Sequence, residues 1–280
     1  MEHVRWTEQP RLAQPVLVAA FEGWNDAGDA ASGAARYLVE RWELTRIAEV
    51  DSEDFYDFTS TRPEVHLDSR GQRSIEWPVT EVFAGPVPGL TDQDVVVLVG
   101  PEPQLRWRTY CGELCDIADA LQVRFAISLG ALLAEVPHTR PTPITASAEG
   151  LDEVAGIPLR PSKYEGPTGI VGVLQDAWRR RGLTSASLWA TVPSYVPGAP
   201  SPKATLALIE MLGRMIGTKI EATDLEIATT SYERQVTELV EADEETATYV
   251  QSLEERHDAD PDHHQGVTLA DEVERFLRDQ

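Results

Sequence analysis

The chain has 280 residues, with 47 acidic against 24 basic side chains and a formal net charge of −23 at pH 7. Such acidity argues against nucleic acid or an anionic membrane as the main ligand, because binding to phosphate begins with a basic surface. Hydrophobic residues make up 42% of the chain, enough to bury a sizeable core. No secretory signal, no membrane-length apolar stretch and no disulfide framework is recognisable, so we expect a cytoplasmic protein.

Up to about residue 220, strand-like apolar runs alternate with helical patterns. Pro15–Phe21 is an apolar run closed by Gly23 and predicts a buried strand, and the helix after it has Asp26 or Asp29 available as its cap. Further helices are predicted over 107–121, 169–181 and 203–216. This alternation predicts an α/β fold: a three-layer α/β/α sandwich around a mixed, mostly parallel sheet. The remaining predicted strands are Ile47–Asp51, Val65–Leu67, Ser74–Trp77, Asp94–Val99, Arg124–Leu129, Ile144–Ser147 and Ser185–Val192.

Two features of this pattern lead to more specific expectations. The strands between residues 47 and 77 follow one another without helices, which predicts antiparallel pairing and a hairpin at one edge of the sheet. Residues 221–280 hold 18 acidic and 4 basic side chains, so we place a boundary between a core domain, 1–220, and an acidic helical segment, 221–280. Within that segment we expect a long helix over Tyr232–Arg256, docked on its own subunit rather than reaching for a partner. A short helix over Thr268–Arg278 follows it.

Glycine-rich or polar turns follow several predicted strands. The carboxyl ends of parallel strands line one edge of an open α/β sheet, where ligands usually bind, so we expect these turns to surround a pocket. The turn at 166–169 also precedes a helix, whose free amide groups can hold an anion. The alternative is that these residues only end strands and cap helices. The candidate ligand-binding residues are Gly23, Trp24, Asn25, Asp26, Gly100, Glu102, Ser128, Gly130, Gly166, Thr168 and Gly169.

No familiar catalytic or metal-binding pattern is present. The chain lacks GxSxG, Walker A, HExxH and GxGxxG motifs. We interpret the histidine cluster His257, His263 and His264 as solvated surface, and Cys111 and Cys115 as reduced thiols facing the core. The sequence therefore predicts no catalytic residues, no cofactor and no metal, and it favours a protein that is not an enzyme.

At the same turns the sequence resembles the proteasome assembly chaperone 2 family, in its bacterial, chiefly actinobacterial branch, over about residues 15–216. The resemblance implies a nucleoside-phosphorylase-like α/β/α sandwich with a helical carboxyl-terminal part. Eukaryotic members are not enzymes and help to assemble the outer ring of the proteasome, partly through a tail whose second-last residue is tyrosine. Asp279 stands at that position here. The stretches that carry the resemblance are Phe21–Ala31, Gly100–Pro103 with Arg106-Trp107, Leu129–Leu133 through Val136–Pro141, Tyr164–Gly169, and Val192-Pro193 through Pro200–Thr205.

Three classes of function remain open: an assembly chaperone or scaffold, a small-molecule-binding protein, and a phosphorylase- or hydrolase-like enzyme with a pocket at the strand ends. We favour the first, a non-catalytic protein that binds unidentified protein partners and neither nucleic acid nor membrane. Phosphorylase-like relatives often form closed rings, which implies a homo-oligomer, with a trimer favoured. Aromatic residues in or beside loops, which we expect at the surface, suit such contacts. They are Trp24, Trp107 and Tyr195.

Overall fold

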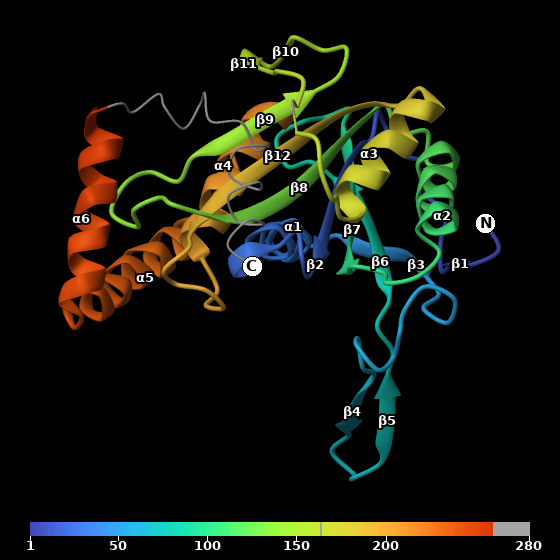
Figure 1. Ribbon diagram of the computed structural model, residues 1–280. Helices are drawn as coiled ribbons and strands as arrows, with labels where there is room; N and C mark the ends of the chain where they lie inside the picture. Colours follow the sequence, from blue (N-terminus) through green and yellow to red (C-terminus); the bar gives the residue numbers. More distant parts are fainter. Residues whose placement is uncertain (163, 260–280) are drawn as a thin grey trace.

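A mixed eight-stranded sheet forms the centre of the molecule in the computed structural model, which describes residues 1–162 and 164–259 (Figure 1). The strand order is β1-β3-β6-β7-β2-β8-β12-β9. The four neighbours β7, β2, β8 and β12 are parallel, whereas the strands outside them pair antiparallel. Their bounds are Val4–Trp6 for β1, Val16–Glu22 for β2, Thr45–Val50 for β3, Thr80–Pro86 for β6, Asp94–Pro101 for β7, Phe125–Ala134 for β8, Ile144–Ala148 for β9 and Thr184–Pro193 for β12.

Two helices cover each face of the sheet, which gives the three layers expected from the sequence. Helices α1 (Ala30–Arg41) and α4 (Pro202–Ile216) pack on one face, and α2 (Trp107–Ala120) and α3 (Ile170–Arg181) pack on the other. Because both faces are covered, the central strands are nearly continuous apolar runs, and residues 17–21 of β2 are fully buried. Cys111 and Cys115 of α2 lie in this core as expected, and burial raises the pKa of Cys111 to about 12.

The cap of α1 is Asp26, one of the two aspartates considered for it. Its Oδ1 accepts hydrogen bonds from the backbone amides of Ala31 (2.7 Å) and Ser32 (3.1 Å). Asp29 directly precedes the helix but makes no side-chain capping bond. A one-turn 3-10 helix, Ala27–Asp29, lies between Asp26 and α1, so the cap reaches over it from the end of the β2 turn. Asp26 therefore links the carboxyl end of β2 to the first turn of α1.

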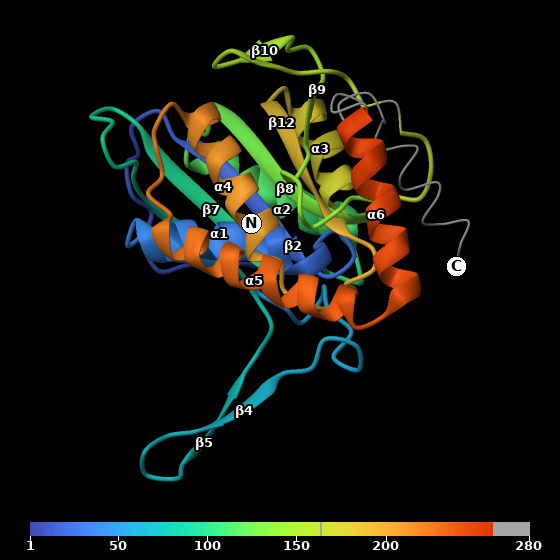
Figure 2. The ribbon, with the colours of Figure 1, turned by 90° about the vertical axis from the view of Figure 1, so that its left-hand side faces the viewer.

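The predicted hairpin forms, but its predicted place is wrong. Strands β4 (Glu64–Leu67) and β5 (Arg73–Glu76) make a separate two-stranded sheet that projects from the body (Figures 1 and 2). The edge it was expected to occupy is already filled, because β6 pairs between β3 and β7, and β1 pairs with the other side of β3. The sequence pattern did not predict β1 or β6.

The acidic segment forms two helices rather than one, α5 (Thr223–Glu241) and α6 (Glu244–Ala259). Asp243 explains the break, since its carboxylate accepts a hydrogen bond from the amide of Thr246 (3.2 Å) and so begins a new helix. Helix α5 packs on α4, and α6 packs on α5 (Figure 2), which confirms docking on the same subunit. The boundary near residue 220 stays a prediction, and the helix expected over Thr268–Arg278 lies outside the described residues.

A buried histidine ties this helical segment to the core. The ring of His138, in the loop after β8, contacts the Tyr195 hydroxyl (2.8 Å) through Nδ1 and the Thr237 hydroxyl of α5 (2.9 Å) through Nε2. Lys203, in the first turn of α4, donates to the His138 carbonyl and to the Glu233 carboxylate of α5. One hydrogen-bond network thus joins the loop after β8 to α4 and α5. Loss of one member would remove a hydrogen-bond partner from each of its neighbours.

We expect the His138→Ala variant to release α5 and α6 while the sheet stays folded. Removing the ring takes one hydrogen-bond partner from each of the Tyr195 and Thr237 hydroxyls, at a cost of about 1–3 kcal/mol. The Tyr195 hydroxyl keeps the His138 backbone amide, and the Thr237 hydroxyl keeps the Glu233 carbonyl. Hydrogen exchange read by mass spectrometry should show faster exchange over 223–259 and unchanged exchange in β2 and β8. His66→Ala, an exposed histidine on the hairpin, is the control. Equal exchange in both variants would contradict this role of His138.

The contact between His138 and α5 should weaken in mild acid. Burial, followed by the charge of Lys203, lowers the pKa of His138 below 6.5, although Glu254 and Glu233 oppose this. The released form therefore binds a proton below about pH 6.5 that the docked form excludes, so docking is complete above that pH and loses stability as the pH falls below it. Exchange over 223–259, corrected for its intrinsic pH dependence, should be faster at pH 5.5 than at pH 7.5. A pH-independent corrected rate would contradict it.

Candidate functional site

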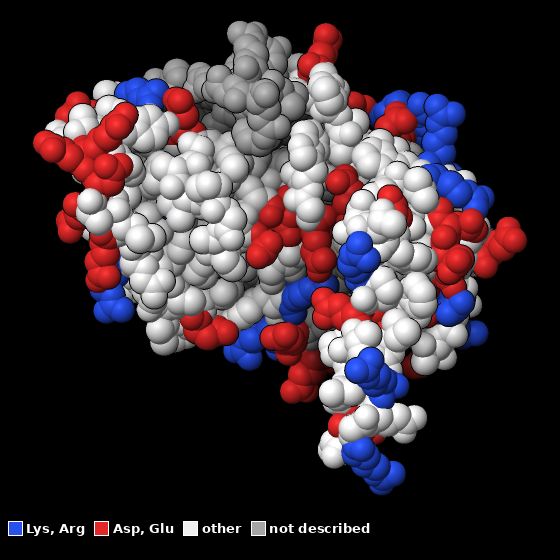
Figure 3. Space-filling view, turned by 60° about the horizontal axis from the view of Figure 1, so that its bottom comes forward, with Lys and Arg blue, Asp and Glu red and all other residues white. Residues whose placement is uncertain are grey.

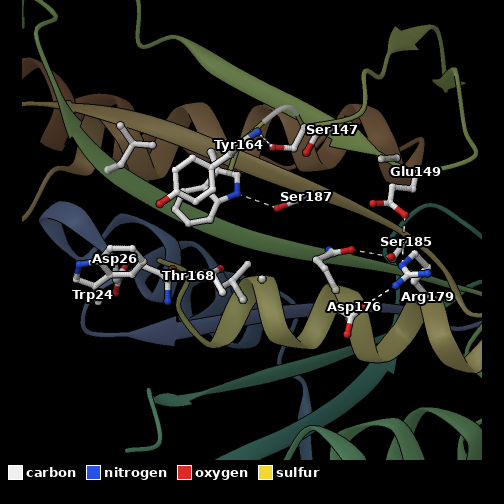
Figure 4. Close-up of a pocket in the computed structure, with 18 of the residues that line it drawn as sticks. Trp24, Asp26, Ser147, Glu149, Tyr164, Thr168, Asp176, Arg179, Ser185 and Ser187 are labelled. Atoms are coloured by element: carbon white, nitrogen blue, oxygen red, sulfur yellow. Dashed lines mark hydrogen bonds and ion pairs between the residues drawn. The ribbon is translucent and has the colours of Figure 1, made fainter. Parts of the chain in front are cut away.

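A cleft of about 960 Å³ opens beside β12, on the face of the sheet that carries α3 (Figure 4). Helix α3 packs on β2, β8 and β12, whereas α4 packs on β9 from the other face. Side chains of β12 and β9 therefore line the cleft floor, α3 forms one wall, and the turn after β2 closes one end. Residues 149–151, 162, 164 and 166–168, which flank the small hairpin of β10 (Glu153–Val154) and β11 (Ile157–Pro158), contribute the opposite wall.

About half of the candidate residues line this cleft, and the others lie behind it. Those that line it are Gly23, Trp24, Asn25, Asp26, Gly166 and Thr168. Three glycines, Gly100, Gly130 and Gly169, are packing positions instead. A Cβ atom at Gly130 would lie 2.6 Å from the Trp189 ring, and one at Gly169 would lie 2.2 Å from the Asn25 amide. At Gly100 the backbone of Val79 is equally close, at 2.6 Å. That any of these residues binds a ligand stays a prediction.

Glu102 joins three of the predicted turns from behind the cleft. Its Oε1 accepts hydrogen bonds from the Asn25 side-chain amide (3.0 Å) and from the Ile170 backbone amide at the start of α3 (2.8 Å). Burial raises the pKa of Glu102, against the lowering effect of these donors. The carboxylate thus occupies the start of α3, where the sequence suggested an external anion. The first-turn amide is already used by the protein's own acid.

Ser128 is also a supporting residue rather than a lining one. It is fully buried in β8, donates to the Ser187 hydroxyl of β12 (3.0 Å) and accepts from the Gln175 amide of α3 (2.8 Å). The Trp189 indole N–H in turn donates to Ser187 (2.9 Å). This chain of hydrogen bonds fixes the Trp189 ring over Gly130 and sets the shape of the cleft floor.

The two ends of the cleft differ in charge. Figure 4 shows Trp24 and Asp26 at one end, Glu149, Asp176 and Arg179 at the other, and Tyr164 and Ser187 between them. Arg179 pairs with Glu149 (3.4 Å) and Asp176 (2.5 Å), so its charge is compensated. At the other end Asp26 is only 5% exposed and its Oδ2 has no hydrogen-bond partner. Burial raises the pKa of Asp26 to about 6, although donors from Ser32 and Ala31 lower it.

Sequence reasoning missed several lining residues, chiefly Tyr164, Gln175, Asp176, Arg179 and Trp189. A signal for the floor was present: Ser185, Ser187 and Trp189 alternate with apolar residues along a strand that is otherwise of the buried type. The walls had no such signal, because Gln175, Asp176 and Arg179 are ordinary polar positions of α3 and Tyr164 lies in a segment without helix or strand. Within residues 1–162 and 164–259, no three His, Cys, Asp or Glu side chains are grouped so that they could hold a metal ion. No helix of this part is long and apolar enough to span a bilayer.

Comparisons with known proteins place this arrangement in a family. Among solved structures, a PAC2 family protein from Streptomyces avermitilis is 45% identical, with 84% of this chain and 99% of that one covered and a TM-score of 0.79. The Mycobacterium tuberculosis proteasome-assembly chaperone homologue Rv2125 is 42% identical, with 84% and 99% covered and a TM-score of 0.76. A Pyrococcus furiosus archaeal proteasome activator, PbaB, is 17% identical, covers 84% and 97%, and shares the fold with a TM-score of 0.66.

No functionally curated protein matches the chain. The PAC2 family itself matches residues 20–240, which include the β2 turn, the cleft and most of α5. This match and the two actinobacterial relatives confirm the resemblance seen in the sequence: the chain belongs to the PAC2 family.

Proposed function

We propose that this protein binds other proteins without catalysis and assists the assembly of a protein complex. The family supports this role, since the Mycobacterium tuberculosis relative is described as a proteasome-assembly chaperone homologue. Proteasome subunits are therefore the first partners to test. The observation that carries the proposal is the projecting hairpin, residues 64–77, which we call the arm.

The arm exposes a concentration of apolar side chains. Nine large hydrophobic residues are exposed in the described part of the chain, and four of them lie on the arm. The register pairs Val65 with Ile75 and Leu67 with Arg73, so the three apolar side chains share one face of the ribbon. A two-stranded hairpin has little stability alone, and an apolar face on such a projection is typical of a surface that docks on a partner. The four residues and their exposed fractions are Val65 (57%), Leu67 (65%), Ile75 (57%) and Trp77 (46%).

The charge of the arm tip differs from that of the whole chain. The tip, residues 68–73, contains Arg70 and Arg73 beside one carboxylate, Asp68, a local net charge of +1 (2 − 1) in a protein of net charge −23. Figure 3 shows basic groups at the free end of the arm, away from the acidic groups of the body. A matching partner surface would be an apolar groove with acidic residues beside it. Association through this tip should then be faster at low salt.

The first prediction from this proposal concerns the apolar face of the arm. The double variant Leu67→Ser, Ile75→Thr should bind purified proteasome core subunits of the same organism at least tenfold more weakly, because it removes the apolar contact. Calorimetry measures the affinity, and native gels follow the rate at which the subunits assemble. Leu239→Ser, an equally exposed leucine (68%) on α5, is the matched control and should change neither.

Equal affinity and assembly rate in wild type, double variant and control would contradict the role of the arm. Wild-type protein that neither binds the subunits nor changes their assembly would exclude them as the partner. Thermal unfolding of the double variant should match that of wild type, since both substituted side chains are exposed.

The homo-oligomer, with a trimer favoured, is also a proposal. Of the three aromatic residues expected at the surface, only Trp24 is well exposed, at 47%. Trp107 is partly buried against the core beneath α2 and α3, and Tyr195 is partly buried against α5 and α6. Light scattering at micromolar concentration should give about three times the 30.9 kDa of one chain. A mass of one chain would contradict it. The arm variant should keep the wild-type mass; a lower mass would mean that the arm docks on a second copy.

A further inference from the structure

Beyond protein binding, we propose that the cleft beside β12 binds a small organic cation, an amine or guanidine with an apolar or aromatic body. Its charged end lies at Asp26 and Asp29, and its body lies against the aromatic side chains of the cleft. The volume, about 960 Å³, lies within the range of small-molecule sites.

Asp26 is the first reason for this choice. One carboxylate oxygen caps α1, and the other is buried beside the cleft with no hydrogen-bond partner. A buried carboxylate oxygen that is left unpaired is costly, and a bound cation would satisfy it. The neighbouring charge that acts on Asp26 is Asp29, a second carboxylate, which is exposed and lines the same end. Among the described residues that line this end of the cleft none is basic, so the negative charge of Asp26 and Asp29 is not compensated there.

The aromatic lining is the second reason. Trp24, 47% exposed, lies at the same end as Asp26, and Tyr164 lies next along the cleft (Figure 4). The Trp189 ring is fixed by its hydrogen bond to Ser187 and forms part of the floor. Indole and phenol faces attract cations, most strongly where water is partly excluded. Aromatic faces beside free carboxylates are the combination that recognises an amine with an apolar body.

The remaining groups argue against an anionic ligand. Arg179 is the one basic residue among the described residues that line the cleft, and Glu149 and Asp176 already pair with it. The amide of Ile170 at the start of α3 is taken by Glu102. A phosphate or carboxylate would find no unpaired cation among these groups and would face Asp26 and Asp29 instead.

The test uses three probes that share an indolylethyl body and differ in the terminal group: the cation tryptamine, the neutral alcohol tryptophol, and the anion indole-3-propionate. Calorimetry on the full-length protein at pH 7.5 should give a Kd below about 1 mM for tryptamine, at least tenfold weaker binding of tryptophol, and no binding of the anion. Equal binding of all three would overturn charge recognition. Absence of tryptamine binding at 10 mM would overturn the proposal for a small cation.

Two variants test where in the cleft the ammonium group of tryptamine binds. Asp26→Asn should weaken tryptamine binding at least tenfold and leave the fold intact, since asparagine caps helices as well as aspartate does. Asp92→Asn, an exposed aspartate outside the cleft, is the control and should change the Kd by less than twofold. Equal effects in both variants, or none in Asp26→Asn, would overturn the assignment. Thermal unfolding without ligand verifies that both variants fold.

The pH dependence gives an independent readout. Tryptamine stays charged across the range, whereas Asp26, with its pKa raised to about 6, loses its charge as the pH falls through that value. Affinity should therefore be highest above pH 7 and fall between pH 7 and 5, and this fall should be absent in Asp26→Asn. A wild-type affinity that is constant from pH 5 to 8 would contradict the role of Asp26.

Discussion

Parallel pairing of β7, β2, β8 and β12 is the constraint on which the rest of the structure depends. It directs four carboxyl ends to one edge of the sheet, and the nearly continuous apolar runs of β7, β2 and β8 require a helix layer on both faces. The turn after β2, the turn after β7 and the start of α3 consequently meet at one place. Glu102 holds two of them together through Asn25 and Ile170.

This arrangement determines the chemistry of the cleft. Glu102 supplies a negative charge to the start of α3 from inside the protein, so the cleft gains no anion site there. The first turn of α1 is likewise satisfied by one oxygen of Asp26, which leaves the second oxygen unpaired. The same structural role, an acid at a helix start, thus uses Glu102 at α3 and Asp26 at α1, and the proposed cation would pair with the second oxygen of Asp26. The arm is separate from both, since it belongs neither to the main sheet nor to the cleft.

The sequence predicted the parts of the fold that burial alone decides. Val16–Glu22 and Asp94–Pro101 were recognisable because strands buried on both faces are continuously apolar. Strand β6 was not, because Glu81 and Phe83 are only half-buried and Gly85-Pro86 resembles a turn. The hairpin was recognised but misplaced, since pairing with β3 depends on distant residues. In the site, the turns at strand ends were predictable from the sequence. Tyr164 and Arg179 were not, because only the tertiary packing of their segments brings them to the cleft.

The protein therefore has two proposed binding surfaces: the arm for a protein partner and the cleft for a small cation. The most direct measurement of the central claim, protein binding through the arm, is hydrogen exchange of the wild-type protein with and without proteasome core subunits. Backbone amides of residues 64–77 should become protected on binding, while those around the cleft exchange as before. Protection elsewhere with an unchanged arm, or no protection at saturating subunit concentration, would contradict it.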